Sequence, residues 1–383
     1  MLFTTLRIQA ISASSCFVST PTKRSLVRAL QSQSSDGIET LPGVSRLGTL
    51  QSLLSERGAP GSRGCNTPHG DLVPISLSTA YSSKEYHDLH PHLLPLAKSQ
   101  STGNLICALR RAYADDADYD SQSISAPWPL VESGVGMPGM RLLSLNSEHF
   151  MRRIAADADA NGGDTASKII GMYNDSLGEG KLSDRALDIL YEAGSVEKLG
   201  YGLDKYVLLR VGPFPDLYET MALNHLSRED IESSLIAAEA NNGKFGGFGS
   251  TFAFYAKLLS SLPQRAEEAR DAARMCIRMP LPSMGLMRTD FSDISKMAEF
   301  ASPDDSTEVA LEKMLEYYEK IREHEKEENS GDKTPKQTAT DDANYLLDVA
   351  CLTGQKYGEV RGKIAEIYSA AGMDDMASFV ERS

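Results

Sequence analysis

Apolar and polar positions change their spacing near residue 146 and divide the chain into two kinds of structure. Before that point, loops separate three short apolar runs, at residues 105–109, 128–132 and 141–145. Short apolar runs between turn signals predict strands. After that point, apolar residues recur at spacings of three and four, which predicts helices. We therefore expect a small β module over 101–146 and a helical domain over 147–326.

The flanking segments have weaker patterns. Residues 41–100 contain recurrent Gly, Pro and Ser, so we expect a poorly ordered, loop-rich segment with one short helix at 86–98. Residues 327–338 are almost entirely polar and predict a linker. Apolar periodicity returns over 339–383 and predicts a C-terminal helical hairpin.

Two windows within residues 216–280 correspond to each other at one constant offset. The matching pairs include Tyr218 with Phe252, Met221 with Tyr255, and Ala222 with Ala256. Each window has the pattern of a helix, a break and a second helix. This pattern resembles the tetratricopeptide family, which repeats a pair of helices with a period of about 34 residues. The second window also has the small residues of the family's second helix and its closing proline, Pro280.

The resemblance implies a mainly α fold built from α-α hairpins, in which small residues let the helices approach closely. It covers only residues 216–280, and the chain lacks the family's usual glycine before the loop inside each repeat. It implies that a partner peptide lies on the concave face of the first helices. The residues expected to contact such a partner are Tyr218, Asn224, Phe252 and Tyr255.

Residues 1–35 differ in charge from the rest of the chain. The chain has a formal net charge of −14, yet this segment carries four basic residues and no acidic one. A basic leader rich in Ser and Thr is typical of an organellar transit peptide, so we expect residues 1–40 to be a disordered leader of this kind. The hydroxyl residues favour a plastid, either its stroma or the thylakoid surface. The basic amphipathic run at 23–30 keeps the mitochondrion as the alternative.

The remaining charge and hydropathy narrow the choice of partner. An acidic chain without clustered Lys and Arg lacks the surface that binds nucleic acid. No stretch approaches the roughly 18–20 apolar residues of a membrane span, which leaves peripheral membrane association open. The five cysteines are scattered singly along the chain, so no zinc or redox motif is present. Cys276 and Cys351 lie in helical patterns and are expected to be buried.

A glycine-rich segment is the first of two motifs that suggest chemistry. Gly134–Gly139 matches the G-x-G-x-x-G pattern of dinucleotide-binding loops. That chemistry needs a helix after the loop to bind the pyrophosphate, whereas residues 140–145 predict a strand. A glycine-rich turn between strands is therefore the favoured interpretation, and a nucleotide site is the alternative.

The second motif copies half of a calcium-binding loop. Asp157, Asp159 and Asn161 alternate and are followed by Gly162, as in the first half of that loop. The twelfth position, which needs a bidentate Glu, is Lys168. A cation at this position repels calcium, so the acidic end of a helix is the favoured interpretation.

Two further clusters have simple structural explanations. His87, His90 and His92 are expected to form a surface cluster rather than a metal site, because Pro91 interrupts any helix that they could share. Residues 244–249 are glycine-rich but lack the Lys-Ser/Thr pair of a phosphate loop, so we expect a turn between repeats. No hydrolase or metalloprotease motif is present.

The sequence thus favours a non-enzymatic organellar scaffold, or an assembly or regulatory factor, without a cofactor or metal. It would bind another protein or an organelle complex through a tetratricopeptide-like helical surface. The first alternative is a nucleotide-binding or enzymatic protein that uses Gly134–Gly139. The second is a calcium-responsive protein that uses residues 157–168.

Overall fold

The computed structural model describes residues 40–68, 70–112, 127–177, 190–328 and 333–382. The transit peptide and disordered leader predicted over 1–40 lie, except for Thr40, outside these residues. Within the described part of the chain, no helix combines the length and the apolar content that crossing a bilayer requires.

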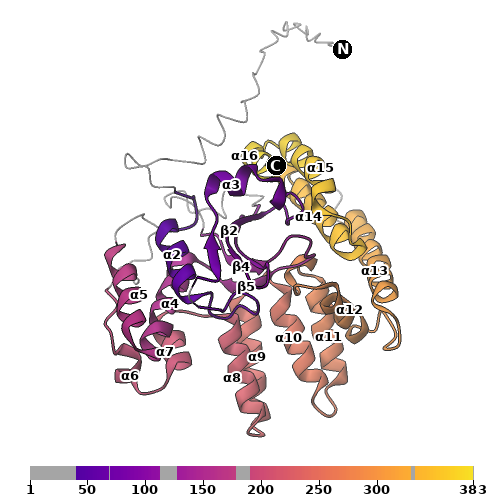
Figure 1. The fold of residues 1–383 in the computed structure, drawn as a ribbon. Coiled ribbons are helices and arrows are strands. Elements are labelled where there is room, and N and C mark those ends of the chain that lie inside the picture. Colours follow the sequence, from indigo (N-terminus) through magenta and orange to yellow (C-terminus); the bar gives the residue numbers. More distant parts are fainter. Residues whose placement is uncertain (1–39, 69, 113–126, 178–189, 329–332, 383) are drawn as a thin grey trace, which may run out of the picture.

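A five-stranded antiparallel sheet forms the centre of the described N-terminal part, and its strands follow one another in chain order (Figure 1). The strands are β1 (Leu72–Pro74), β2 (Leu93–Ser99), β3 (Leu105–Leu109), β4 (Leu130–Ser133) and β5 (Arg141–Ser144). The predicted β module is confirmed by β3, β4 and β5. Every residue of β3 and β4 is buried, which explains why these strands are continuous apolar runs rather than alternating ones.

The segment before the predicted β module is more regular than its composition indicates. It contains α2 (Leu47–Arg57) and α3 (Leu77–Ser82), and α2 buries four leucines. The helix predicted at 86–98 is wrong, because a 3-10 turn, η1 (Lys84–Tyr86), is followed by strand β2. Pro95 lies where the β2–β3 register shifts, a position at which the missing N–H of proline is tolerated.

The helices directly after β5 lie on one side of the sheet (Figure 1). They are α4 (Ser147–Asn161), α5 (Asp164–Asp175), α6 (Ser195–Leu199) and α7 (Leu203–Arg210). Helix α4 begins where predicted, and the Asn146 side chain caps it by accepting a hydrogen bond from the His149 N–H.

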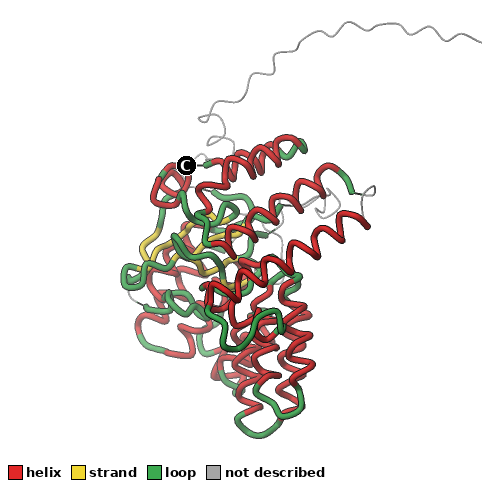
Figure 2. Tube along the Cα trace, turned by 90° about the vertical axis from the view of Figure 1, so that its right-hand side faces the viewer, coloured by secondary structure: helices red, strands yellow, loops and turns green. Residues whose placement is uncertain are grey.

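The helical hairpins predicted over 216–280 are confirmed and project from the sheet side by side (Figures 1 and 2). They comprise α8 (Pro215–Leu226), α9 (Ile231–Lys244), α10 (Gly249–Ser260) and α11 (Ala266–Ile277). The predicted constant offset recurs in the first helix of each pair. Helices α8 and α10 have equal lengths, and the same number of positions separates their first residues and their last residues. Alanines fill the interfaces between these helices, including the fully buried Ala222, Ala238 and Ala256. The next pair is α12 (Arg288–Met297) and α13 (Thr307–Glu328).

The last helices return to the sheet. They are α14 (Pro335–Thr353), α15 (Tyr357–Ala370) and α16 (Asp374–Glu381), and they lie beside the N-terminal part in Figure 1. A single buried core joins residues of the sheet with residues of these helices, among them Leu347, Tyr368 and Phe379. The C-terminal helices are therefore an integral part of the N-terminal structure. Cys276 and Cys351 are buried, as predicted.

The glycine-rich loop before β5 packs tightly against the 3-10 turn η3 (Leu281–Ser283) and the residues after it. The Met140 N–H donates to the Pro282 carbonyl at 2.7 Å, and the Gly139 N–H donates to the Leu286 carbonyl at 3.3 Å. A Cβ atom on Gly139 would lie 1.8 Å from the Gly285 carbonyl oxygen. Only glycine permits this approach of one backbone to another.

We predict that Gly139→Ala lowers the free energy of unfolding by about 1–3 kcal/mol or more, because the two backbones must separate. Urea denaturation would measure this loss. The matched control is Gly362→Ala on the exposed face of α15, where an added Cβ meets no atom within 4 Å. That change should raise stability by about 0.5–1 kcal/mol, since Ala favours a helix over Gly. Equal denaturation midpoints for the two variants would contradict the predicted backbone contact.

Candidate functional site

The four residues predicted to contact a partner lie on the hairpins but do not form one cluster. Tyr218 packs edge-on against Phe245, with the ring centroids 6.2 Å apart. Phe252 is partly buried between helices. The Tyr255 hydroxyl donates to the Glu239 carboxylate at 2.9 Å, which joins α10 to α9. Asn224 alone among the four is exposed.

The base of the first hairpin is fixed to the N-terminal part by two ion pairs. Arg153 of α4 donates to both carboxylate oxygens of Asp216, at 2.7 and 2.5 Å. Arg141 of β5 donates to Glu219 at 3.0 Å. Burial raises the pKa of Glu219, while the nearby guanidinium groups of Arg141 and Arg63 oppose this rise. A bidentate arginine–carboxylate pair fixes orientation as well as distance, so the position of α8 relative to α4 is well defined.

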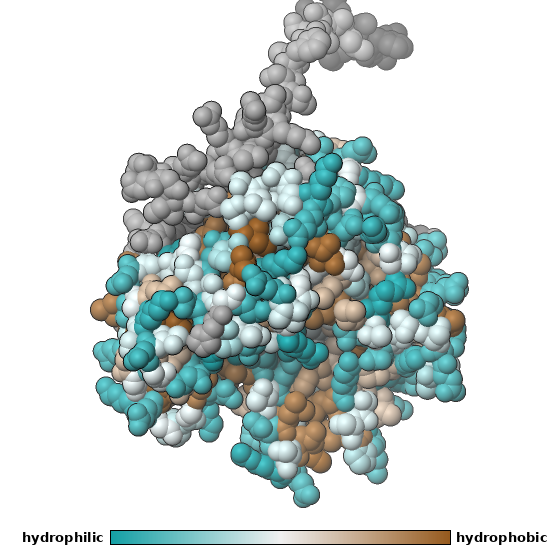
Figure 3. Space-filling view, in the orientation of Figure 1, coloured by the Kyte–Doolittle hydropathy of each residue, from teal (hydrophilic) through white to brown (hydrophobic). Residues whose placement is uncertain are grey.

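The half of this hairpin away from its base exposes large apolar side chains. Leu223 of α8 is 51% exposed, and Ile231 and Ile236 of α9 are 43% and 60% exposed. Figure 3 shows apolar side chains gathered over the lower part of the hairpins. We call Leu223, Ile231 and Ile236 the apolar hairpin surface. Large apolar side chains exposed together commonly mark contacts with other proteins.

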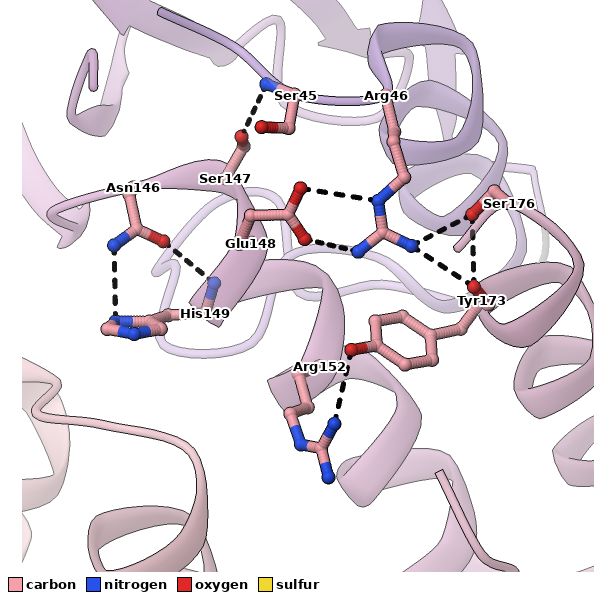
Figure 4. A network of polar contacts seen from close by, with 9 residues as sticks. All are labelled: Ser45, Arg46, Asn146, Ser147, Glu148, His149, Arg152, Tyr173 and Ser176. Carbon is pink, nitrogen blue, oxygen red and sulfur yellow. Dashed lines mark hydrogen bonds and ion pairs between the residues drawn. The ribbon is translucent and has the colours of Figure 1, made fainter. Parts of the chain in front are cut away.

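A polar network around Arg46 joins the segment before α2 to α4 and α5 (Figure 4). The Arg46 guanidinium pairs with Glu148 and donates to the Tyr173 carbonyl at 3.1 Å and to the Ser176 hydroxyl at 3.0 Å. These partners use the donors of the guanidinium, and no activated nucleophile lies among them. The network therefore holds the segment before α2 against α4 and α5.

The structure contradicts the nucleotide alternative in its main requirement. Residues 134–139 join the antiparallel strands β4 and β5 rather than a strand and a helix. The Pro138 carbonyl accepts hydrogen bonds from the Tyr357 hydroxyl, at 2.5 Å, and from the Cys351 thiol. The loop is a junction between the sheet and the C-terminal helices, and it lacks the helix N-terminus that binds phosphates.

The calcium alternative fails because the carboxylates that would bind calcium already pair with other groups of the protein. Asp157 and Asp159 lie inside α4, and Asp157 pairs with Arg57. Asp159 accepts hydrogen bonds from the Tyr191 hydroxyl and from the N–H groups of Gly194 and Val196. Within the residues that the structure describes, no three or more His, Cys, Asp or Glu side chains are grouped as metal ligands.

The predicted surface cluster of histidines is wrong for two of its three members. His90 and His92 are 5% and 6% exposed, and their rings meet edge to face 5.4 Å apart. His92 shares a hydrogen bond with the Tyr368 hydroxyl at 3.0 Å. Burial lowers the pKa of both imidazoles, that of His92 to about 3, so both are neutral at physiological pH.

Asp348 of α14 is a buried titratable group that sequence reasoning missed. It is 3% exposed and accepts hydrogen bonds from the Leu281 N–H, at 2.9 Å, and from the Tyr318 hydroxyl. Burial raises its pKa to about 7, although the two hydrogen bonds and the charge of Arg322 act in the opposite direction. In the sequence, the only local signal of this buried carboxyl group is that Asp348 lies within the apolar stripe of a predicted helix.

Comparisons with known proteins assign this fold to a family. The chain is 30% identical over 302 residues to an Arabidopsis thaliana protein, Protein IN CHLOROPLAST ATPASE BIOGENESIS, chloroplastic. The match covers 76% of this chain and 78% of that protein. The chain belongs to the IN CHLOROPLAST ATPASE BIOGENESIS family.

Two family models also match parts of the chain. The PAB middle domain matches residues 215–301, and the PAB C-terminal domain matches residues 314–383. The middle domain begins at the first residue of α8 and contains the apolar hairpin surface. The hairpins that resemble tetratricopeptide repeats thus lie within the PAB middle domain. No solved structure matches the chain.

We predict that Asp348→Asn removes a pH dependence of stability. The pKa of Asp348 is about 7 in the folded chain and 3.8 in the ordinary reference state. Wild-type stability should therefore fall as pH rises from 4 to 7, because the folded state keeps a proton that the unfolded state has already released over this range. The slope approaches about 1.4 kcal/mol per pH unit within this window.

Urea denaturation at several pH values would measure this effect against Asp175→Asn, a control at the exposed end of α5. The Asp348→Asn variant should gain stability relative to wild type above pH 7 and not near pH 4. Parallel pH profiles for all three proteins would show that Asp348 titrates normally.

Proposed function

We propose that this protein is a non-enzymatic plastid factor that assists biogenesis of the chloroplast ATPase by binding one or more of its proteins. The observation that carries the proposal is the 30% identity to a chloroplast ATPase biogenesis protein, across 78% of that relative. The basic, hydroxyl-rich leader supports the plastid, in the stroma or at the thylakoid surface.

The helical hairpins supply a surface suited to this role. The base of the first hairpin is fixed by two ion pairs, whereas the half away from this base exposes apolar side chains that a partner would bury. Partner binding across the faces of packed hairpins is the mode of tetratricopeptide repeats, and we propose the same mode here. Tyr218, Asn224, Phe252 and Tyr255 stay in the proposed contact set, and exposed Asn224 is the member whose substitution disturbs the fold least.

Genetic complementation tests the biological role. Plants that lack this protein should accumulate less assembled chloroplast ATPase, measured on native gels, and the full chain should restore the amount. The other photosynthetic complexes serve as internal controls. Normal ATPase levels in the absence of the protein and of any close relative would reject the proposal.

We predict that the double substitution Leu223→Ser and Ile236→Ser weakens binding to chloroplast ATPase subunits at least tenfold. Burial of each such side chain contributes about 1.5–3 kcal/mol, and the substitutions remove most of it. Pull-down from plastid extracts, followed by titration with the captured subunit, would measure the loss.

The matched control is Leu209→Ser on α7, which replaces a side chain that is 65% exposed outside both PAB domains. All variants should melt within a few degrees of wild type, since the replaced side chains are exposed. Equal capture of subunits by the double variant and the control would place the partner on another surface.

A further inference from the structure

A cavity of about 230 Å³ lies where the sheet, the turn between α9 and α10, and helix α14 meet. His90 and His92 line it before β2, Phe248 lines it before α10, and Asp348 lines it from α14. The two histidines and Asp348 are buried, whereas Arg111 and Asn344 are half-buried. The buried groups thus form the floor of the cavity, and the half-buried pair lies nearer its opening.

Two polar side chains near the opening have no hydrogen-bonding partner among the described residues. The Arg111 guanidinium lies over the Phe248 ring, 5.2 Å from its centroid, and pairs with no described carboxylate. Asn344 also lines the cavity, and its amide forms no hydrogen bond with any described residue. Half-buried arginines usually pair with an anion, because their donors are costly to leave unused.

His90 provides a third unused donor on the floor. Its Nδ1 accepts a hydrogen bond from the His92 backbone N–H at 3.3 Å. Since the imidazole is neutral, an accepting Nδ1 assigns the ring proton to Nε2. This Nε2–H forms no hydrogen bond with a described residue. The side chain is more than nine-tenths buried, and a buried donor is normally hydrogen-bonded.

Other polar groups of the lining are already satisfied. Both Asp348 oxygens accept hydrogen bonds, and the Ser283 hydroxyl accepts from the Gly249 N–H at 2.8 Å and donates to the Pro280 carbonyl. Asp348 is the one acid among the described residues of the lining, and burial raises its pKa to about 7, which weakens its repulsion of an anion near neutral pH. The unused groups of Arg111, Asn344 and His90 are mostly donors, so hydrogen-bond acceptors are what the cavity chiefly lacks.

The rest of the lining is largely apolar, with Leu109, Met140 and Leu347 among its residues. The cavity is smaller than the roughly 300–1,000 Å³ of pockets for drug-sized ligands. A single ring or short chain that carries one acidic group matches both the size and the mixture of surfaces.

We infer that this cavity binds a small organic anion whose carboxylate or phosphate group pairs with Arg111. The amide of Asn344 and the Nε2–H of His90 orient the ligand, and its apolar body packs against Phe248 and Leu347. Such a site is independent of the proposed role in ATPase biogenesis, since its lining shares no residue with the apolar hairpin surface.

Isothermal titration calorimetry on the full chain tests this site with three probes that share a ring. Benzoate and phenyl phosphate carry the two candidate anions, and benzyl alcohol is the neutral analogue. At least one anion should bind, whereas benzyl alcohol should bind at least tenfold more weakly. The stronger anion distinguishes a carboxylate ligand from a phosphate ligand.

Arg111→Gln should weaken the affinity for the anion at least tenfold, because the substitution removes the positive charge and the forked donors of the guanidinium. Asn344→Leu, at a half-buried helical position, should also weaken binding of the anion. This second variant keeps the test decisive if the Arg111→Gln protein fails to fold. The matched control is Arg228→Gln, at an exposed turn outside the cavity lining. This control should bind like wild type.

Three outcomes would overturn the inference. They are the absence of binding for both anions, equal affinities for benzyl alcohol and the anions, and equal affinities of the Arg111→Gln and Arg228→Gln proteins. None of these outcomes bears on ATPase biogenesis, which is measured in plants and with ATPase subunits.

Discussion

Two buried arginines near the C-terminus satisfy the backbone carbonyls of a loop in the N-terminal part of the chain, and the closure of the whole fold depends on them. Arg361 donates to the carbonyls of Tyr86, His87 and Leu89, and Arg382 donates to those of Pro91 and Leu93. Buried carbonyls without donors are costly, so the loop needs these partners. Burial lowers the pKa of Arg361 to about 10 and that of Arg382 to about 9, so both remain charged at neutral pH.

This closure determines how the helical hairpins are presented. Because α15 and α16 return to the sheet, the hairpins project from a scaffold that is closed at both ends of the described chain. The pairs Arg153–Asp216 and Arg141–Glu219 then fix the base of α8 on this scaffold. A fixed base and an exposed apolar tip allow a partner to bind without a large cost for ordering the hairpin.

The sequence could predict the elements that depend on local pattern. Strands β3 to β5 and the constant offset between the two hairpins follow from apolar spacing alone, since each element buries one continuous stripe or run. Strand β2 was missed because Pro91 and Pro95 break its pattern, and its pairing with β3 is what stabilises it. The glycine loop at 134–139 is the turn between strands that its pattern favoured. The role of Gly139 could not be predicted, because its contact is with Gly285, which is far away in the sequence.

The candidate sites were harder to predict for the same reason. The burial of His90 and His92 depends on Tyr357 and Tyr368, whose rings contact theirs and lie on α15. Asp348 becomes unusual only when η3 and α13 pack against α14. The cavity therefore exists only after the C-terminal helices have closed on the sheet. A ligand that binds there binds the folded chain and not the unfolded one, so it must stabilise this closure in proportion to its affinity and concentration.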